Sequence, residues 1–115
     1  FTLHIGIASA PLLASHRALR VDSSAFLSAC NPHSRLLDAA SNLTLHLALG
    51  RELRGRSLQI REGVGEHPSN GWPAEPSYLV FGLTLEAAKT LAQRHEQNAL
   101  VWAGPDATPQ LILLR

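Results

Sequence analysis

Apolar and polar residues alternate at the start of the chain. Leu3, Ile5 and Ile7 are separated by His4 and Gly6, and a period of two is typical of a strand with one buried face. Short apolar runs bounded by turn-forming residues predict further strands. These runs cover residues 25–30, 57–61, 77–83, 99–103 and 110–114. The final two flank a Gly-Pro-Asp turn and are expected to form a hairpin.

A short helical turn and a longer helix are expected between these strands. One is capped by Ser9 and runs to Ser15, with Pro11 tolerated in its first turn because the amide it lacks would be unpaired there. The other is capped by Thr84 and ends near His95, and its alanines and leucines form one apolar stripe.

The segment 35–54 fits two patterns. Every second residue from 43 to 49 is leucine, as in a strand, yet leucine and alanine also recur at helical spacing. Length, composition and a following glycine favour a helix capped by Ser34, although Gly50 inside it weakens the prediction. Asn42 has a modest helix propensity, and we expect its amide to bond a neighbouring loop.

The order of these elements contains the β-α-β-β-α-β run of a split βαβ sandwich. We therefore predict an α+β fold, with two main helices on one face of a mostly antiparallel, ferredoxin-like sheet. An N-terminal strand and a C-terminal hairpin extend it. The other face would be polar, covered by the first segment, or used in self-association, which leaves a homo-oligomer open.

Composition limits the number of domains, the class of partner and the cellular compartment that we expect. The 115 residues suffice for a single domain, 1–115, without disulfides or metals. Apolar runs of only a few residues argue against a membrane span. A net charge of +1 argues against a nucleic-acid partner, since the arginine-rich stretch 51–62 is interleaved with glutamates and lacks aromatic residues for stacking. The N-terminus lacks the basic start of a secretory signal, so we expect a cytoplasmic protein.

Residues 62–77 crowd proline, glycine, tryptophan and acidic residues into one segment. Prolines restrict the backbone, so Trp72 and Glu75 can be held in place with little further loss of entropy, which suits a binding edge. In the plainer interpretation, Trp72 covers an open end of the core, and the prolines and Gly71 make consecutive turns.

A second set of polar residues lies where predicted elements change. Asn31, His33 and Ser34 occupy a strand-to-helix junction, where free backbone amides could receive an anion or a polar ligand. Gln97 and Asn98, just before a strand, could supply amide groups to the same mouth. Helix capping and turn formation are the simpler roles for these residues.

Other site chemistry has little support. The six histidines offer no closely spaced ligand pair, so neither a metal nor a cofactor is expected. Cys30, among apolar neighbours, fits a small buried side chain in a reducing compartment better than a nucleophile. A hydrolase that uses Glu66, His67 and Glu75 near Asn31 remains an alternative, although no nucleophile elbow, phosphate loop or HExxH motif is present.

Several stretches resemble a known family. AFLSACNPHSR, then Asn42, EGVGEHPSNGWPAEPSYLVFGLTLEAA and EQNALVW are similar to the bacterial family called domain of unknown function 3293. The resemblance spans about residues 3–103, and the W-P-x-E-x-S and Q-N-A-x-V-W elements carry it. It implies a small cytoplasmic bacterial protein without an assigned activity. The family favours tryptophan where Cys30 stands, and a more charged helix where LTLHLALG stands.

The sequence therefore favours a non-enzymatic module that binds an unknown small molecule or protein. We expect its shallow cleft between the 62–77 segment and the junction from Asn31 to Ser34, with Trp72 at the rim. The enzyme alternative requires Glu66, His67 or Glu75 to converge in a concavity with Asn31 or Asn98.

Overall fold

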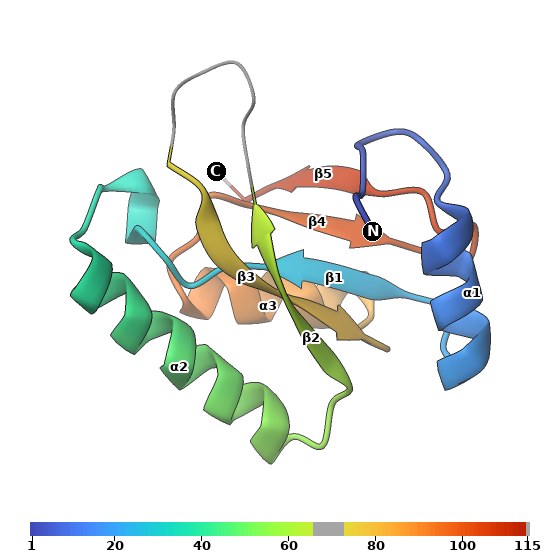
Figure 1. Cartoon of the computed structure of the whole chain (residues 1–115), viewed down its shortest axis with the longest axis horizontal. Coiled ribbons are helices and arrows are strands. Elements are labelled where there is room, and N and C mark those ends of the chain that lie inside the picture. The colour runs from blue at the N-terminus through green and yellow to red at the C-terminus, as the bar shows by residue number, and fades with distance from the viewer. Residues whose placement is uncertain (66–72, 115) are drawn as a thin grey trace.

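The computed structural model describes residues 1–65 and 73–114. Within them the chain forms three α-helices and five strands (Figure 1). The helices are α1 Ala10–Leu19, α2 Ala39–Gly55 and α3 Leu85–Arg94. The strands are β1 Ser24–Leu27, β2 Ile60–Gly65, β3 Glu75–Phe81, β4 Ala99–Ala103 and β5 Gln110–Leu113. One turn of 3-10 helix, Pro32–Ser34, lies between β1 and α2.

The strands form one sheet in the order β2-β3-β1-β4-β5, and every neighbouring pair is antiparallel. The predicted α+β class is therefore confirmed, as is the C-terminal hairpin of β4 and β5. The run from β1 to β4 has the predicted β-α-β-β-α-β order, and its spatial order is compatible with a split βαβ unit.

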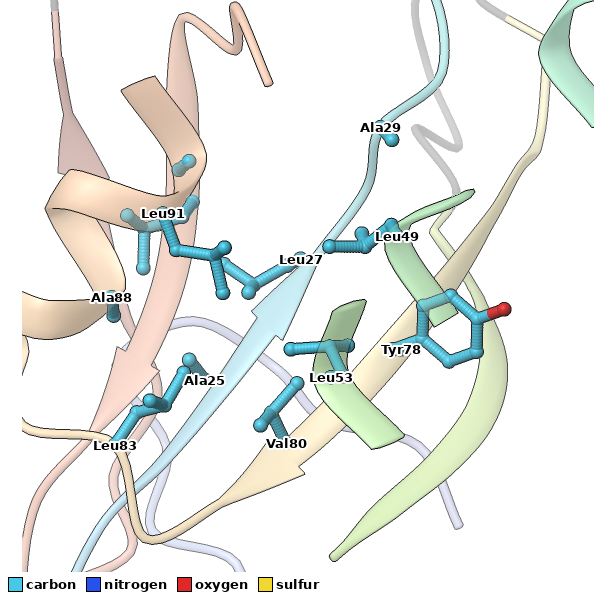
Figure 2. Packing of buried hydrophobic residues seen from close by; sticks show 12 residues of the cluster. Ala25, Leu27, Ala29, Leu49, Leu53, Tyr78, Val80, Leu83, Ala88 and Leu91 are labelled. Carbon is cyan, nitrogen blue, oxygen red and sulfur yellow. The ribbon is translucent and has the colours of Figure 1, made fainter. Parts of the chain in front are cut away.

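Helices α2 and α3 share one face of the sheet. Strand residues alternate between faces, so Leu27 of β1 and Tyr78 of β3 point to the same side as the leucines of both helices. Figure 2 shows Leu27 lying between Leu91 of α3 and Leu49 of α2. Burial of these side chains supplies the main hydrophobic stabilisation of the molecule.

The opposite face is covered in part by α1. Leu12, which is fully buried, packs with Leu79 and Phe81 of β3. On the same face, the ring of Phe26 reaches across β3 to β2, where a Cβ on Gly63 would lie 3.1 Å from that ring. Because such contacts are tighter than ordinary packing allows, glycine at this position lets one aromatic ring span three strands.

The N-terminal strand expected at Leu3, Ile5 and Ile7 is wrong. The Ile7 amide donates to the His4 carbonyl in a tight turn, and Gly6 has a φ of +80°. This turn directs the chain toward α1 before a ladder can form. Leu3 instead packs against the α1 side of the sheet, so apolar alternation here reflects burial of one side chain rather than strand pairing.

Helix capping was predicted correctly at two of three sites. The hydroxyls of Ser9 and Thr84 accept the amides of Leu12 and Ala87, at 3.2 and 3.1 Å. Ser34 does not cap α2, which begins at Ala39 with Asp38 as its cap. The reason is conformational, because Ser34 has a φ of +59° and a cap residue is normally extended.

Several strand boundaries also shift for local reasons. The first buried strand ends at Leu27 rather than residue 30, because the Ser28 hydroxyl accepts the Cys30 amide and turns the backbone. The strand predicted from Ser57 begins at Ile60, since Ser57 is left-handed and completes the turn after α2.

The longest described helix, α2, has 17 residues, and no helix in the described ranges could cross a bilayer.

Gly50, the residue that weakened the helix prediction, lies where α2 crosses β3. A Cβ at this position would collide with the hydroxyl of Tyr78. The Tyr78 ring stacks on His46 with centroids 4.2 Å apart, and its hydroxyl donates to the His46 carbonyl at 3.1 Å. Burial raises the pKa of Tyr78, so this donor stays protonated. The missing side chain thus permits close approach of helix and sheet.

Candidate functional site

The chain makes an unusual turn where it leaves β1. Asn31, His33 and Ser34 have φ values of +48°, +53° and +59°, a region that residues with a Cβ seldom adopt. Each such conformation costs on the order of 1–3 kcal/mol. The turn therefore persists only because contacts from other elements fix it.

Side chains from α2 and β3 hold one side of this turn. Asn42, in the first turns of α2, accepts the Asn31 amide at 2.9 Å and donates to the Asn31 side-chain oxygen at 2.9 Å. The Asn31 Nδ2 group donates to Glu75 Oε2 at 2.7 Å, and its Oδ1 also accepts the Leu37 amide at 2.8 Å. Asn31 is buried, so these bonds satisfy polar groups that water does not reach. The expected bond from Asn42 to a neighbouring loop is confirmed.

Residues between α3 and β4 hold the other side. The His33 amide donates to the Glu96 carbonyl at 2.7 Å, and the His33 ring lies 3.8 Å from the Glu96 carboxylate. Asn98 Nδ2 donates to the Ser34 hydroxyl at 2.7 Å. Gln97 Nε2 donates to the backbone oxygen one residue before Asn31, at 3.1 Å. The turn is thus held from both flanks.

We call this group the turn cluster. Its members are Asn31, His33, Ser34, Asn42, Glu75, Gln97 and Asn98. Figure 1 shows the segment before α2 and the start of β3 at the same end of the sheet. All the predicted ligand-binding residues within the described ranges meet here, because both junctions lie at this end. Trp72, with Glu66 and His67, lies outside the described residues.

Cys30 lies under the turn cluster and is buried. Its Sγ is 3.6 Å from the Pro76 carbonyl. Burial raises the pKa of the thiol, which outweighs the opposing hydrogen bond from Ser28. The neutral thiol is a weak nucleophile, so Cys30 packs as a small apolar side chain, as its neighbours in the sequence indicate.

No group of three histidine, cysteine, aspartate or glutamate side chains is placed to hold a metal ion in the part of the chain that the structure describes. Carboxylate chemistry is present nevertheless. Glu75 and Glu96 flank the turn from opposite sides. The Oδ1 atom of Asn98 is buried and accepts no hydrogen bond from any described residue, and such an acceptor is uncommon in folded proteins.

A depression of about 320 Å³ lies at the other end of β1, and sequence reasoning missed it. Its walls are mainly apolar and come from Asp22, Ser23, Thr84, Leu85, Trp102 and Pro105. The indole of Trp102 donates to the Leu83 carbonyl at 3.0 Å. These residues come from three separate segments, so no local motif could have indicated them.

A buried histidine and serine pair was also missed. His16 of α1 and Ser24 of β1 lie with Nε2 and Oγ 2.8 Å apart, and both side chains are buried. Burial lowers the pKa of His16, and the nearby Asp22 carboxylate opposes this effect. Because substrate cannot reach Ser24, the pair joins α1 to the sheet and is not a nucleophilic dyad.

Comparison with known proteins decides the family. The model of the family described as "Protein of unknown function (DUF3293)" matches residues 27–100. The chain belongs to the DUF3293 family. The match covers 74 of 115 residues (100 − 27 + 1), less than the range expected from sequence. It includes the whole turn cluster but leaves α1 and β5 outside. No curated protein and no solved structure matches the chain.

Proposed function

We propose that this DUF3293 protein is a binding module that recognises a polar ligand at the turn cluster. One observation carries the proposal. A backbone turn with three left-handed residues, Asn31, His33 and Ser34, is fixed from two sides by residues far apart in the chain. Polar groups held in advance bind with less ordering cost than flexible ones, and strain of this kind concentrates at functional sites.

The chemistry of the cluster favours a ligand that donates hydrogen bonds. Glu75 and Glu96 place carboxylates on both flanks of the turn. A primary amine or a guanidinium group offers several donors and a positive charge. We therefore infer a small molecule or peptide that carries such a group, bound in a cytoplasmic setting.

The enzyme alternative has one supporting observation. Glu75, one of its three residues, lies beside Asn31. We place it second because two residues that could act as nucleophiles, Cys30 and Ser24, are inaccessible. Cys30 is buried with a raised pKa, and Ser24 is buried beside His16.

The binding proposal is tested by thermal shift with a panel of primary amines and guanidines. Neutral alcohols and carboxylates of the same carbon skeletons serve as comparison compounds. Amines are expected to raise the melting temperature of the natural protein, whereas the comparison compounds do not. In Glu75→Gln, which keeps an oxygen to accept from Asn31, we expect affinity to fall about tenfold, or roughly 1.4 kcal/mol.

Glu86→Gln is the matched control, since Glu86 lies on α3 with its side chain 83% exposed. It should respond to amines as the natural protein does. In an NMR titration, the amides of Asn31, of residues 33–35 and of Asn98 should shift most. An absence of any amine response, or an equal response in Glu75→Gln, would refute the proposal.

A further inference from the structure

The outer edge of β5 carries backbone groups that no described residue uses within the strand. The Leu114 amide donates to the Asn98 carbonyl of the neighbouring strand at 2.8 Å. Antiparallel ladders alternate between bonded and non-bonded pairs, so Gln110 and Ile112 bond to β4. The N–H and C=O groups of Leu111 and Leu113 therefore point away from the sheet.

A hydrogen bond one residue before β5 confirms which of its backbone groups point away from the sheet. The Pro109 carbonyl has the same phase as Leu111, and it accepts the Gly6 amide at 2.8 Å. The N-terminal segment thus bonds just before β5 and then turns away at His4–Ile7. Leu111 and Leu113 remain at the end of the sheet, and the two residues are 53% and 68% exposed.

The two edges of the sheet differ in charge. On β2, the residues whose backbone points outward are Ile60, Glu62 and Val64, since the Phe81 amide bonds to the Gln59 carbonyl and sets the phase. A glutamate thus lies at the centre of that edge. From residue 107 to 114 the chain has no charged residue. Charges on edge strands oppose pairing between molecules, so β2 has this protection and β5 lacks it.

We propose that β5 pairs with β5 of a second copy, as antiparallel neighbours around a two-fold axis. With Ile112 on the axis, Leu111 of each copy lies opposite Leu113 of the other. In this register all the outward N–H and C=O groups of both leucines are bonded. The exposed leucine side chains pack on each other across the axis. An uncharged edge complements itself in this way, whereas an acidic or basic peptide finds no opposite charge on it. The inference does not depend on the turn cluster.

Sedimentation velocity across a range of concentrations tests the pairing on the full chain. With increasing concentration, the measured mass of the natural protein is expected to rise from the 12.4 kDa of one chain toward twice that value. Two double variants then test the register. L111K/L113K places lysines opposite each other and should stay at the mass of one chain, because like charges directly opposite repel. L111K/L113E places lysine opposite glutamate and should still dimerise.

Hydrogen exchange on the natural protein gives a readout independent of the variants. The amides of Leu111 and Leu113 should exchange roughly tenfold more slowly at high than at low protein concentration. The amide of Ile112, which already bonds within the sheet, should change less. A natural protein that is monomeric at every concentration, or a dimer that persists unchanged in L111K/L113K, would overturn the proposal.

Discussion

At Gly50, α2 lies so close to Tyr78 that a methyl group cannot be accommodated without movement. Gly50→Ala should therefore lower the free energy of unfolding by about 1–3 kcal/mol through overpacking. Alanine brings a gain of about 1 kcal/mol to a helix interior, so the net loss is expected to reach about 2 kcal/mol. Urea denaturation measures the difference.

Gly55→Ala is the matched control at the end of the same helix. No atom lies within 4 Å of a Cβ at Gly55, so this change should leave stability equal or higher. Adding Tyr78→Phe to Gly50→Ala removes the colliding hydroxyl and should recover part of the loss. If Gly50→Ala alone is as stable as the natural protein, the contact with Tyr78 does not determine the residue.

Individual residues of the turn cluster could be foreseen from sequence, but their conformation could not. Asn31 and Asn98 were found because polar residues at two junctions were expected at one end of a sheet. Asn42 was found because an amide is unusual within a helix. The left-handed turn was missed because Ser34 and Asp38 are both good caps, and tertiary bonds from Asn98 decide between them.

At the scale of elements, α1 is joined to β1 by a buried histidine. Burial lowers the pKa of His16 below its ordinary value of 6.5, more than Asp22 raises it. The groups near its ring are the Ser24 hydroxyl, the Phe81 ring and the Asp22 carboxylate. The unfolded chain thus takes up a proton at a higher pH than the folded one.

This linkage fixes the sign of a pH effect. The contribution of His16 to stability is complete above about pH 6.5 and is lost as the pH falls through its lowered folded pKa. Urea denaturation at a series of pH values should show a steeper loss in the natural protein than in His16→Gln, which cannot take up the proton. Parallel pH profiles for the two proteins would contradict the assignment.

Among elements, the sequence was most reliable where a cap and an apolar stripe agreed. Thr84 with the following alanines and leucines placed α3 to within a residue. The segment at Leu3 failed because alternation over five residues does not distinguish a strand from a packed coil. His16 and His46 were not placed in the core, because periodicity counts histidine as polar.

For the whole molecule, Glu52 connects the two helices that share one face of the sheet. Its carboxylate lies 3.1 Å from His95 Nε2, 3.0 Å from Arg94 and 3.4 Å from Arg56. Two of these partners belong to the end of α3, whereas Glu52 itself belongs to α2. A network of several charges is worth more than one exposed pair.

Glu52→Gln should lower the free energy of unfolding by about 1 kcal/mol, and high salt should reduce the difference. Glu86→Gln removes only an exposed pair with Lys89 at 3.8 Å and should change stability by less than about 0.5 kcal/mol. Thermal and urea unfolding of both variants at low and high salt check these values. Equal effects of the two changes would show that Glu52 contributes no more than a surface charge.

The α+β class and the C-terminal hairpin followed from the order of elements, since a β-α-β-β-α-β run has few ways to bury both helices. Contacts between distant segments did not follow. The depression beside Trp102 needs the start of β1, the start of α3 and the end of β4 together. The charge network of Glu52 needs a particular rotation of α2 relative to α3, which residue spacing does not define.

The side chain of Phe26, in β1, covers part of the edge strand β2. Its ring lies over Gly63 and Gly65 of β2, which have no side chains of their own on that face. The edge strand is therefore covered there by a residue that belongs to the middle of the sheet. Replacing that ring with a small side chain would uncover backbone two strands away, and solvent would gain access to the β2–β3 ladder at two glycines that have no side chain to cover it.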